Sequence, residues 1–208
     1  MLKRCCDEIK LAFIENKIFI IISFFILVFS LLLGYFLQPL LFDFLNPAVD
    51  ELTQKVDNGI IQLTFHDIFI NNLIIIFQMF IYGMLLCLSI VVLAYNGFFT
   101  GYYVAISQDF FRTLAFLLPH GIFELPSCAL ACASGLVLFN FLYHLLKSYY
   151  YEYTFKDAFL CNFNKLKQAV IIFSVAVVLM AIAGFIEVYI TIPLANFILC
   201  WNFLIVFQ

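Results

Sequence analysis

Charge is scarce in this sequence. Only 11% of its 208 residues are charged, whereas 66% are hydrophobic. A soluble domain usually carries about 25% charged residues, so a chain of this composition could not cover its own surface against water. This low fraction of charged residues excludes the class of soluble globular domains. The net charge of -3 excludes a nucleic-acid partner that would be held by a basic surface.

A set of paired cysteines is also lacking. The seven cysteines are an odd number, and several lie inside apolar runs, where Cys behaves as a small hydrophobe. Cys128 and Cys132 share a helix face, but no second pair stands near them, so they predict no metal site. Cys5 and Cys6 are interpreted as reduced cytosolic thiols, with acylation as the alternative. The sequence predicts no disulfide framework and no cofactor.

Long apolar runs, in contrast, recur along the chain and predict an all-α polytopic membrane bundle. About 20 apolar residues cross the hydrocarbon core of a bilayer. The first run, 18–37, is too long for a cleaved signal peptide and predicts an uncleaved signal anchor. The other expected spans are 70–95, a broken stretch 97–118 interrupted by Gln108, Asp109 and Arg112, 122–146, and 169–190. The run 194–207 either crosses or lies at the interface, which gives five to six spans in one transmembrane domain, 1–208.

The basic residues predict how this domain is oriented. Lys and Arg accumulate on the cytoplasmic side of membranes, and here they gather in segments 1–17 and 147–168. We therefore expect a cytoplasmic N-terminus, a cytoplasmic loop 147–168 and an acidic extracytoplasmic loop 38–69, in a multi-pass protein of the cell membrane. Within the outer loop, Asn46-Pro47 predicts a helix start, and residues 57–59 predict a turn. The sequence alone indicates no partner-docking element in this loop.

Polar residues from separate expected spans fall at a similar depth near the outer side. The stretch LPHGIFELP, 118–126, places a histidine and a glutamate four residues apart between two prolines. Charges in hydrocarbon pair with one another or face water, so we predict one connected polar cluster. The alternatives are a helix-end role for Glu124 and a structural hydrogen bond for His120. The predicted cluster consists of Asn71, Asn72, Arg112, His120, Glu124 and Glu187.

Small residues predict close helix packing in two places. Gly97 and Gly101 form a small-xxx-small pair after Asn96, and the Asn96-Gly97 dipeptide is also where we expect the second span to end. In the next span, Ser127, Ala131 and Gly135 repeat at every fourth position. Packing within the chain explains both patterns most simply, and self-association into a homo-oligomer is the alternative.

Four motifs occur in an order that resembles the stage II sporulation protein M family, over about residues 10–195. The motifs are NN (71–72), NGFFTG (96–101), LLPHGIFELPSCALACASGL (117–136) and AIAGFIEVYITIP (181–193). The resemblance implies a membrane component that, in spore-forming bacteria, works with two peptidoglycan-degrading enzymes during engulfment. Members in non-sporulating bacteria and archaea have no settled role. The residues that carry over are Asn71, Asn72, Asn96, Gly97, Gly101, Pro119, His120, Gly121, Glu124, Leu125, Pro126, Glu187 and Pro193.

Three functions remain open from the sequence. The resemblance favours a non-enzymatic scaffold that recruits cell-envelope partners while embedded in the lipid bilayer. A small transporter or channel is the main alternative, because intramembrane carboxylates and a broken span are what an ion or proton path needs. An intramembrane enzyme would use His120 and Glu124 as acid and base, with Ser127 or Cys128 as the nearest nucleophile.

Overall fold

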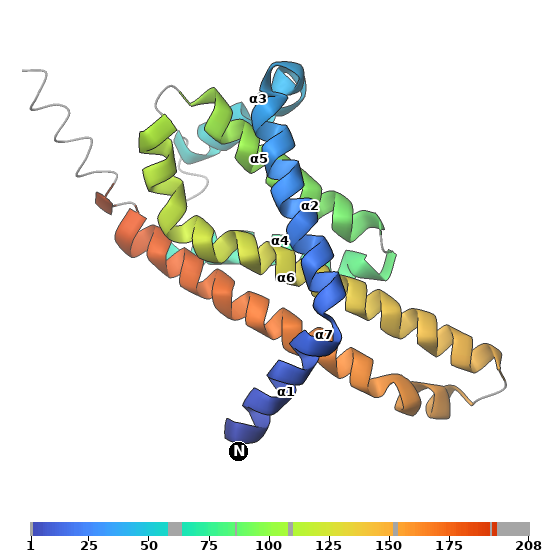
Figure 1. The fold of residues 1–208 in the computed structure, drawn as a ribbon. Helices are drawn as coiled ribbons and strands as arrows, with labels where there is room; N and C mark the ends of the chain where they lie inside the picture. Colours follow the sequence, from blue (N-terminus) through green and yellow to red (C-terminus); the bar gives the residue numbers. More distant parts are fainter. Residues whose placement is uncertain are drawn as a thin grey trace, which may run out of the picture.

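The protein is built entirely from helices in the part of the chain that the computed structural model describes, residues 2–57, 64–85, 87–107, 110–151, 154–191 and 193–194 (Figure 1). In chain order the elements are α1 (Leu2–Glu15), α2 (Lys17–Phe36), α3 (Gln38–Asp57), α4 (Phe65–Tyr82), the 3-10 turn η1 (Gly83–Leu85), α5 (Cys87–Ile106), α6 (Phe110–Tyr150), α7 (Phe155–Ile186) and the π-helical turn η2 (Glu187–Thr191).

Five of these helical segments are long and apolar enough to cross a membrane, which confirms the predicted fold class. About 20 apolar residues suffice to span the hydrocarbon core, and a helix satisfies its own backbone hydrogen bonds there. The chain is thus a multi-pass membrane protein in contact with lipid. The spans are Lys17–Phe36, Phe65–Leu85, Leu88–Ile106, Thr113–Tyr150 and Phe155–Thr191.

Helices α6 and α7 are the two longest and pack against each other as a hairpin, and α2 crosses this hairpin (Figure 1). Residues 127–138 of α6 are all buried, and many of them are small, so neighbouring backbones approach closely. On α2 the buried residues are Ser23, Leu27, Ser30 and Gly34. Their spacing of three or four residues places them on one face, which packs against α5 and α6.

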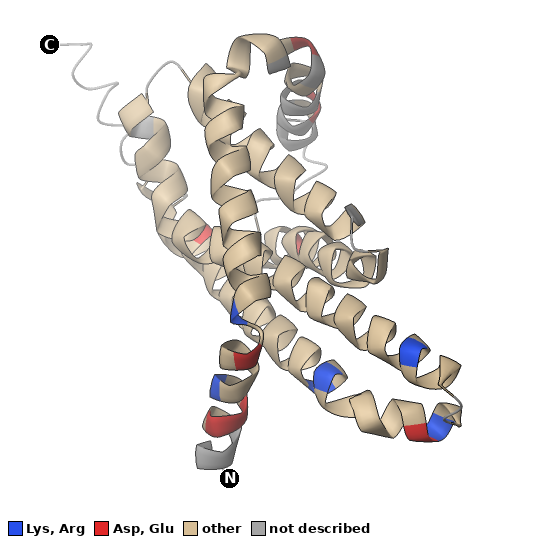
Figure 2. Ribbon diagram, turned by 45° about the vertical axis from the view of Figure 1, so that its right-hand side comes forward, with Lys and Arg blue, Asp and Glu red and all other residues tan. Residues whose placement is uncertain are grey.

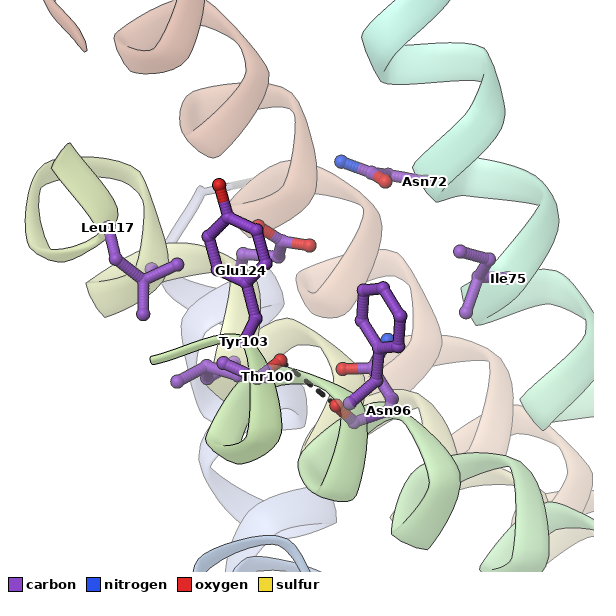
Figure 3. Close-up of a pocket in the computed structure, with 10 residues that line it drawn as sticks. Asn72, Ile75, Asn96, Thr100, Tyr103, Leu117 and Glu124 are labelled. Carbon is purple, nitrogen blue, oxygen red and sulfur yellow. Dashed lines mark hydrogen bonds between the residues drawn. The ribbon is translucent and has the colours of Figure 1, made fainter. Parts of the chain in front are cut away.

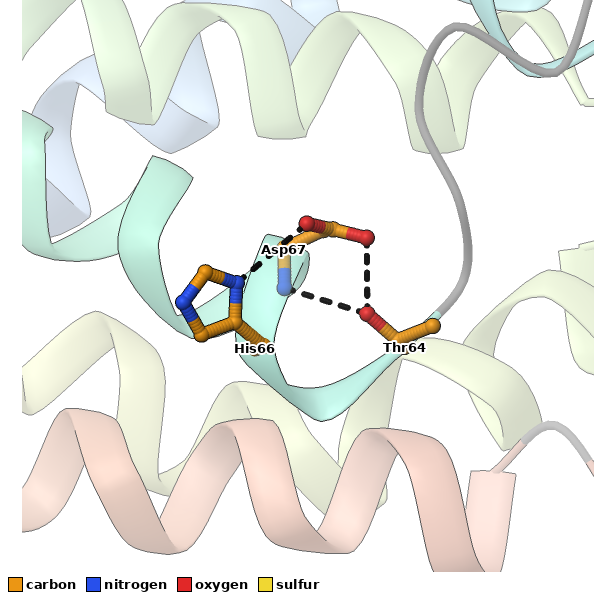
Figure 4. Close-up of polar contacts among 3 residues, drawn as sticks. All are labelled: Thr64, His66 and Asp67. Carbon is orange, nitrogen blue, oxygen red and sulfur yellow. Dashed lines mark hydrogen bonds and ion pairs between the residues drawn. The ribbon is translucent and has the colours of Figure 1, made fainter.

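Matching caps begin α4 and α7. The hydroxyl oxygen of Thr64 accepts a hydrogen bond from the Asp67 backbone N–H at 3.3 Å and donates to the Asp67 carboxylate at 2.7 Å (Figure 4). Thr154 and Asp157 repeat the arrangement at the start of α7. Both are Thr-Phe-x-Asp sequences of the capping-box type, and they fix where each helix starts.

The described charges are separated along the molecule. In Figure 2 the blue residues lie on α1, at the start of α2 and on the arms of the α6–α7 hairpin toward its turn. The described part of α3, at the opposite end, shows red but no blue. The two basic segments that were predicted to share one side of the membrane therefore lie toward the same end of the molecule.

The predicted boundary between the second and third spans is wrong. Asn96 and Gly97 lie inside α5, and the interruption falls instead at η1. Within the bilayer an unpaired backbone group is costly, so a glycine that packs against a neighbouring helix does not by itself end a helix. The expected broken third span, 97–118, is the end of α5 and the beginning of α6; Gln108 and Asp109 lie outside the described residues.

The outer loop is more helical than predicted. We expected a short helix from Pro47, but α3 begins at Gln38 and contains Pro47. The predicted cap, Asn46, instead accepts a hydrogen bond from the Tyr102 hydroxyl at 3.3 Å with its side-chain oxygen. That contact ties α3 to α5.

In the α6–α7 hairpin, the predicted start of the fourth span and the predicted extent of the loop 147–168 are both wrong. Helix α6 does not start at residue 122 but continues through Pro119 and Pro126, and Figure 1 shows it bending in that region. Proline removes a backbone donor and bends a helix, yet membrane helices tolerate it. Most of the expected loop 147–168 is helical, since α6 ends at Tyr150 and α7 starts at Phe155. The run 194–207 lies outside the described residues apart from Leu194.

Candidate polar cavity between α4, α5 and α6

A cavity of about 230 Å³ lies where three membrane-spanning helices meet. Each helix contributes at least one polar side chain, and apolar or aromatic groups complete the wall. Figure 3 shows the Asn72 and Glu124 side chains entering the space from different helices. The lining residues are Asn72 and Ile75 from α4; Asn96, Phe99, Thr100 and Tyr103 from α5; and Leu117, Gly121, Glu124 and Leu125 from α6.

Glu124 is the acidic group of this cavity. It lies well inside α6, which starts at Phe110, so the alternative of a carboxylate in the first helical turn is wrong. The Nε2 atom of His120 approaches a Glu124 carboxylate oxygen to 4.0 Å, one turn earlier on the same helix. This distance is at the limit for an ion pair, which forms only when His120 is protonated, and it is too long for a hydrogen bond. No hydrogen bond within the described part of the chain reaches the carboxylate. The oxygens of Glu124 therefore remain available to a ligand.

His120 connects α6 to the end of α7. Its Nδ1 atom lies 3.5 Å from the Thr191 hydroxyl oxygen, and only 13% of its side chain is exposed. Thr191 is the last residue of η2, and Glu187 is its first. The His120–Thr191 contact therefore joins the end of α7 to this region, and π-helical turns such as η2 frequently occur at functional sites.

Glu187 brings a second carboxyl group toward the first. It is close enough to Glu124 for their charges to interact, although the two residues lie on α6 and at the end of α7. Two acidic groups and a histidine, which come from distant parts of the sequence, thus share one region among the membrane spans.

A second cavity of about 240 Å³ adjoins the first. Tyr103 and Leu117 line both cavities, and Thr113, Phe116 and His120 complete the second. Glu124 and His120 therefore line adjacent spaces, and Tyr103 and Leu117 belong to the walls of both.

The structure brings together part of the predicted polar cluster. Glu124, His120, Glu187 and Asn72 lie in the region just described. Asn71 is exposed on α4 and does not line the cavity. The backbone of Arg112 belongs to α6, and its side chain lies outside the described residues.

The chain matches a known protein family over most of its length. The family model described as "Stage II sporulation protein M" matches residues 18–192. The chain belongs to the stage II sporulation protein M family. The match includes all five spans except the first residue of the first, so the cavity is built from the part that family members share.

A relative of this family member aligns with it over most of both chains. It is an uncharacterized protein, MJ0793, of Methanocaldococcus jannaschii, 30% identical over 155 residues; the match covers 72% of this chain and 82% of the relative. No solved structure matches.

In this stage II sporulation protein M family member, the predicted packing glycines lie at backbone-to-backbone contacts. A Cβ atom added to Gly101 would lie 2.0 Å from the Leu31 carbonyl oxygen on α2. One added to Gly97 would lie 2.1 Å from the Ser30 hydroxyl oxygen and 3.0 Å from the Leu27 backbone carbonyl oxygen. The Asn-Gly-x-x-x-Gly sequence therefore holds α5 against α2 within the chain.

The small residues of α6 contact two other helices. The Ser127 hydroxyl donates a hydrogen bond of 2.7 Å to the Ala176 carbonyl of α7. A Cβ atom added to Gly135 would lie 2.7 Å from the Met79 carbonyl oxygen of α4. Ala131, between them, is fully buried.

Sequence reasoning missed the contribution of α5 to the cavity. Asn96 was expected only to support helix packing, but it lines the cavity, and its carbonyl accepts a hydrogen bond of 2.9 Å from Thr100. Residues 96, 99, 100 and 103 are spaced as one helix face, adjacent to the face of Gly97 and Gly101. That spacing of polar and aromatic residues was a readable signal.

The described cysteines do not extend the site toward metal binding. Cys128 and Cys132 are buried with free thiols. Among the described residues, no three His, Cys, Asp or Glu side chains gather in a way that could hold a metal ion.

Proposed function

We propose that this protein is a non-enzymatic membrane component that holds a partner protein of the cell envelope. Membership of the stage II sporulation protein M family supports the proposal, because the resemblance implies a membrane subunit that works with peptidoglycan-degrading enzymes. The main structural support is that α3, a helix of 20 residues, lies outside the five candidate spans.

Helix α3 has a fixed side and an open side. Leu45 is buried with 1% exposure, and Asn46 bonds to Tyr102 of α5, so the helix is held in place. Leu40 is 79% exposed and Phe42 49% exposed, and Asp43 is exposed next to them. Apolar side chains next to a charge suit a protein partner, because interfaces join an apolar centre to a polar rim.

The charge distribution supports an external location for α3. The basic hairpin and α1 lie toward the opposite end of the molecule from α3 (Figure 2). Under the positive-inside rule those basic segments are cytoplasmic. Helix α3 then faces the extracytoplasmic side, where envelope enzymes act.

Site-specific crosslinking in native membranes tests the proposal. A photoreactive phenylalanine analogue at Phe42 is expected to yield a discrete adduct with an envelope protein, identified by mass spectrometry. Phe29 on α2 is the matched control, because it is 52% exposed but lies within a membrane span, and we expect it to yield lipid adducts. The proposal is wrong if Phe42 yields the same lipid adducts as Phe29, or an adduct only with a second copy of the chain.

The second candidate function is translocation of a proton or small ion. It is favoured by the convergence of Glu124, Glu187 and the amides of Asn72 and Asn96 among the spans, since intramembrane ionisable groups commonly mark transport paths.

Flux measurements in proteoliposomes test this second candidate. Translocation predicts a pH-driven flux that Glu124→Gln reduces at least about tenfold, because a neutral amide cannot carry the charge or the proton. Asp43→Asn on α3 should leave the flux unchanged. A flux equal to that of protein-free liposomes would rule translocation out under these conditions and leave the scaffold proposal.

A further inference from the structure

The cavity between α4, α5 and α6 has the chemistry of a cation site rather than an empty packing defect. We propose that it binds a primary ammonium group, carried either by a phospholipid headgroup or by a small soluble amine. The proposal does not depend on the scaffold role, because it concerns a different surface of the protein from α3.

The first support is the electrostatic situation of Glu124. A carboxylate among membrane spans is expensive unless it is paired or reaches water. His120 stays 4.0 Å away, and its other ring nitrogen faces Thr191. A cationic group inside the cavity would supply the missing partner through charge-assisted hydrogen bonds.

The second support is the number and placement of acceptors. An ammonium group has three N–H donors and no acceptor. The cavity offers a carboxylate on α6 and side-chain amides, each with one acceptor oxygen, on α4 and α5, from Glu124, Asn72 and Asn96 (Figure 3). The Thr100 hydroxyl already donates to the Asn96 carbonyl, so its oxygen is left to accept. Acceptors from three helices thus surround one space.

The third support is the aromatic part of the wall. Phe99 and Tyr103 line the same cavity, and aromatic faces attract ammonium groups. Hard metal ions, in contrast, require oxygen ligands at about 2.0–2.6 Å on several sides, and rings do not provide them. The mixed carboxylate, amide and aromatic lining selects an organic cation over a bare metal ion.

The size of the cavity limits what accompanies the ammonium group. Its volume of about 230 Å³ is below the range of about 300–1,000 Å³ typical of sites for drug-sized ligands. It has room for an amine with a short carbon chain. The adjoining space past Tyr103 and Leu117, about 240 Å³, can take what is attached to that chain.

Lipid and amine binding to the full-length protein tests the proposal. Protein in mild detergent and amine-free buffer is mixed with equal phosphatidylethanolamine and phosphatidylglycerol, and retained lipid is measured by native mass spectrometry. Ethanolamine without lipid is titrated separately by calorimetry. We expect a preference for phosphatidylethanolamine, ethanolamine binding, or both. A preference for the lipid without ethanolamine binding identifies a headgroup, and ethanolamine binding without a lipid preference identifies a soluble amine.

Variants then locate the site. Glu124→Gln preserves the shape of the side chain and should weaken binding by about tenfold or more, because it removes a charge-assisted hydrogen bond. Asp7→Asn, which removes an exposed acid from α1, should bind like the wild type. Equal retention of the two lipids by wild-type protein together with no ethanolamine binding would overturn the proposal. Unchanged binding by Glu124→Gln would overturn it as well.

Discussion

Replacing Gly101 with alanine is expected to lower the stability of the protein by about 2–3 kcal/mol, the upper part of the range for overpacked cores. The added Cβ atom would lie 2.0 Å from the Leu31 carbonyl oxygen, and a backbone atom cannot rotate away as a side chain can. Helix α5 must then move away from α2 along much of their shared interface. For a chain of this size the expected fall in melting temperature is about 4–12 °C, measured by thermal unfolding in detergent.

Gly121 provides the matched control. It is also a buried helical glycine, but a Cβ atom added there would meet only the Leu117 side chain, at 3.8 Å. Gly121→Ala should therefore leave the melting temperature unchanged or raise it slightly, because alanine favours a helix more than glycine does. Equal losses in the two variants would show that α2 and α5 are not in the close contact described.

The membrane architecture was predictable because lipid imposes it on the sequence. A span must be apolar over about 20 residues and must pair its own backbone groups. Both requirements are visible in a single sequence, and α2 was accordingly placed to within a residue or two. The number of spans before the 147–168 segment was also predicted correctly.

The ends of the inner helices were harder to predict, because tertiary packing determines them. Asn96-Gly97 has the composition of a turn, but its glycine serves contact with α2 and the helix continues. Gly83 looked unremarkable in the sequence, yet a Cβ atom added there would lie 2.2 Å from the Gly135 Cα atom. Nothing local distinguishes these two glycines. Their partners, on α2 and α6, are known only once the helices are assembled.

The cavity residues likewise include some that the sequence predicts and others that only the packing of the helices reveals. Glu124 and Asn72 were predicted from the rule that polar residues in membranes have a role. Phe99 and Tyr103 were not, because aromatic residues are abundant in this chain and few of them line the site. Phe99 and Tyr103 line the cavity because their face of α5 turns toward α6. Gly97 and Gly101 determine this orientation, since their face packs against α2.

The polar cluster leads to a second prediction with a large expected effect. Glu124→Gln and Glu187→Gln should each stabilise the protein, because each removes a carboxyl charge from a region of low dielectric that also holds the other. The double variant should gain less than the sum of the two single variants, since the repulsion between the two groups can be removed only once. We expect a coupling free energy within about 0.5–3 kcal/mol, the range for residues that interact directly, from chemical or thermal unfolding in detergent at pH 8.

A control pair separates this coupling from a general effect of net charge. Asp43→Asn removes one negative charge from α3, so its combination with Glu124→Gln should be additive within about 0.3–0.5 kcal/mol, as for distant sites. If the Glu124 and Glu187 substitutions were equally additive, their carboxyl groups would not share a site, and the end of α7 would have to be separated from the cavity. Coupling confined to the Glu124–Glu187 pair would instead show that the two carboxylates interact directly. A cation bound near Glu124 would then also stabilise the charged form of Glu187.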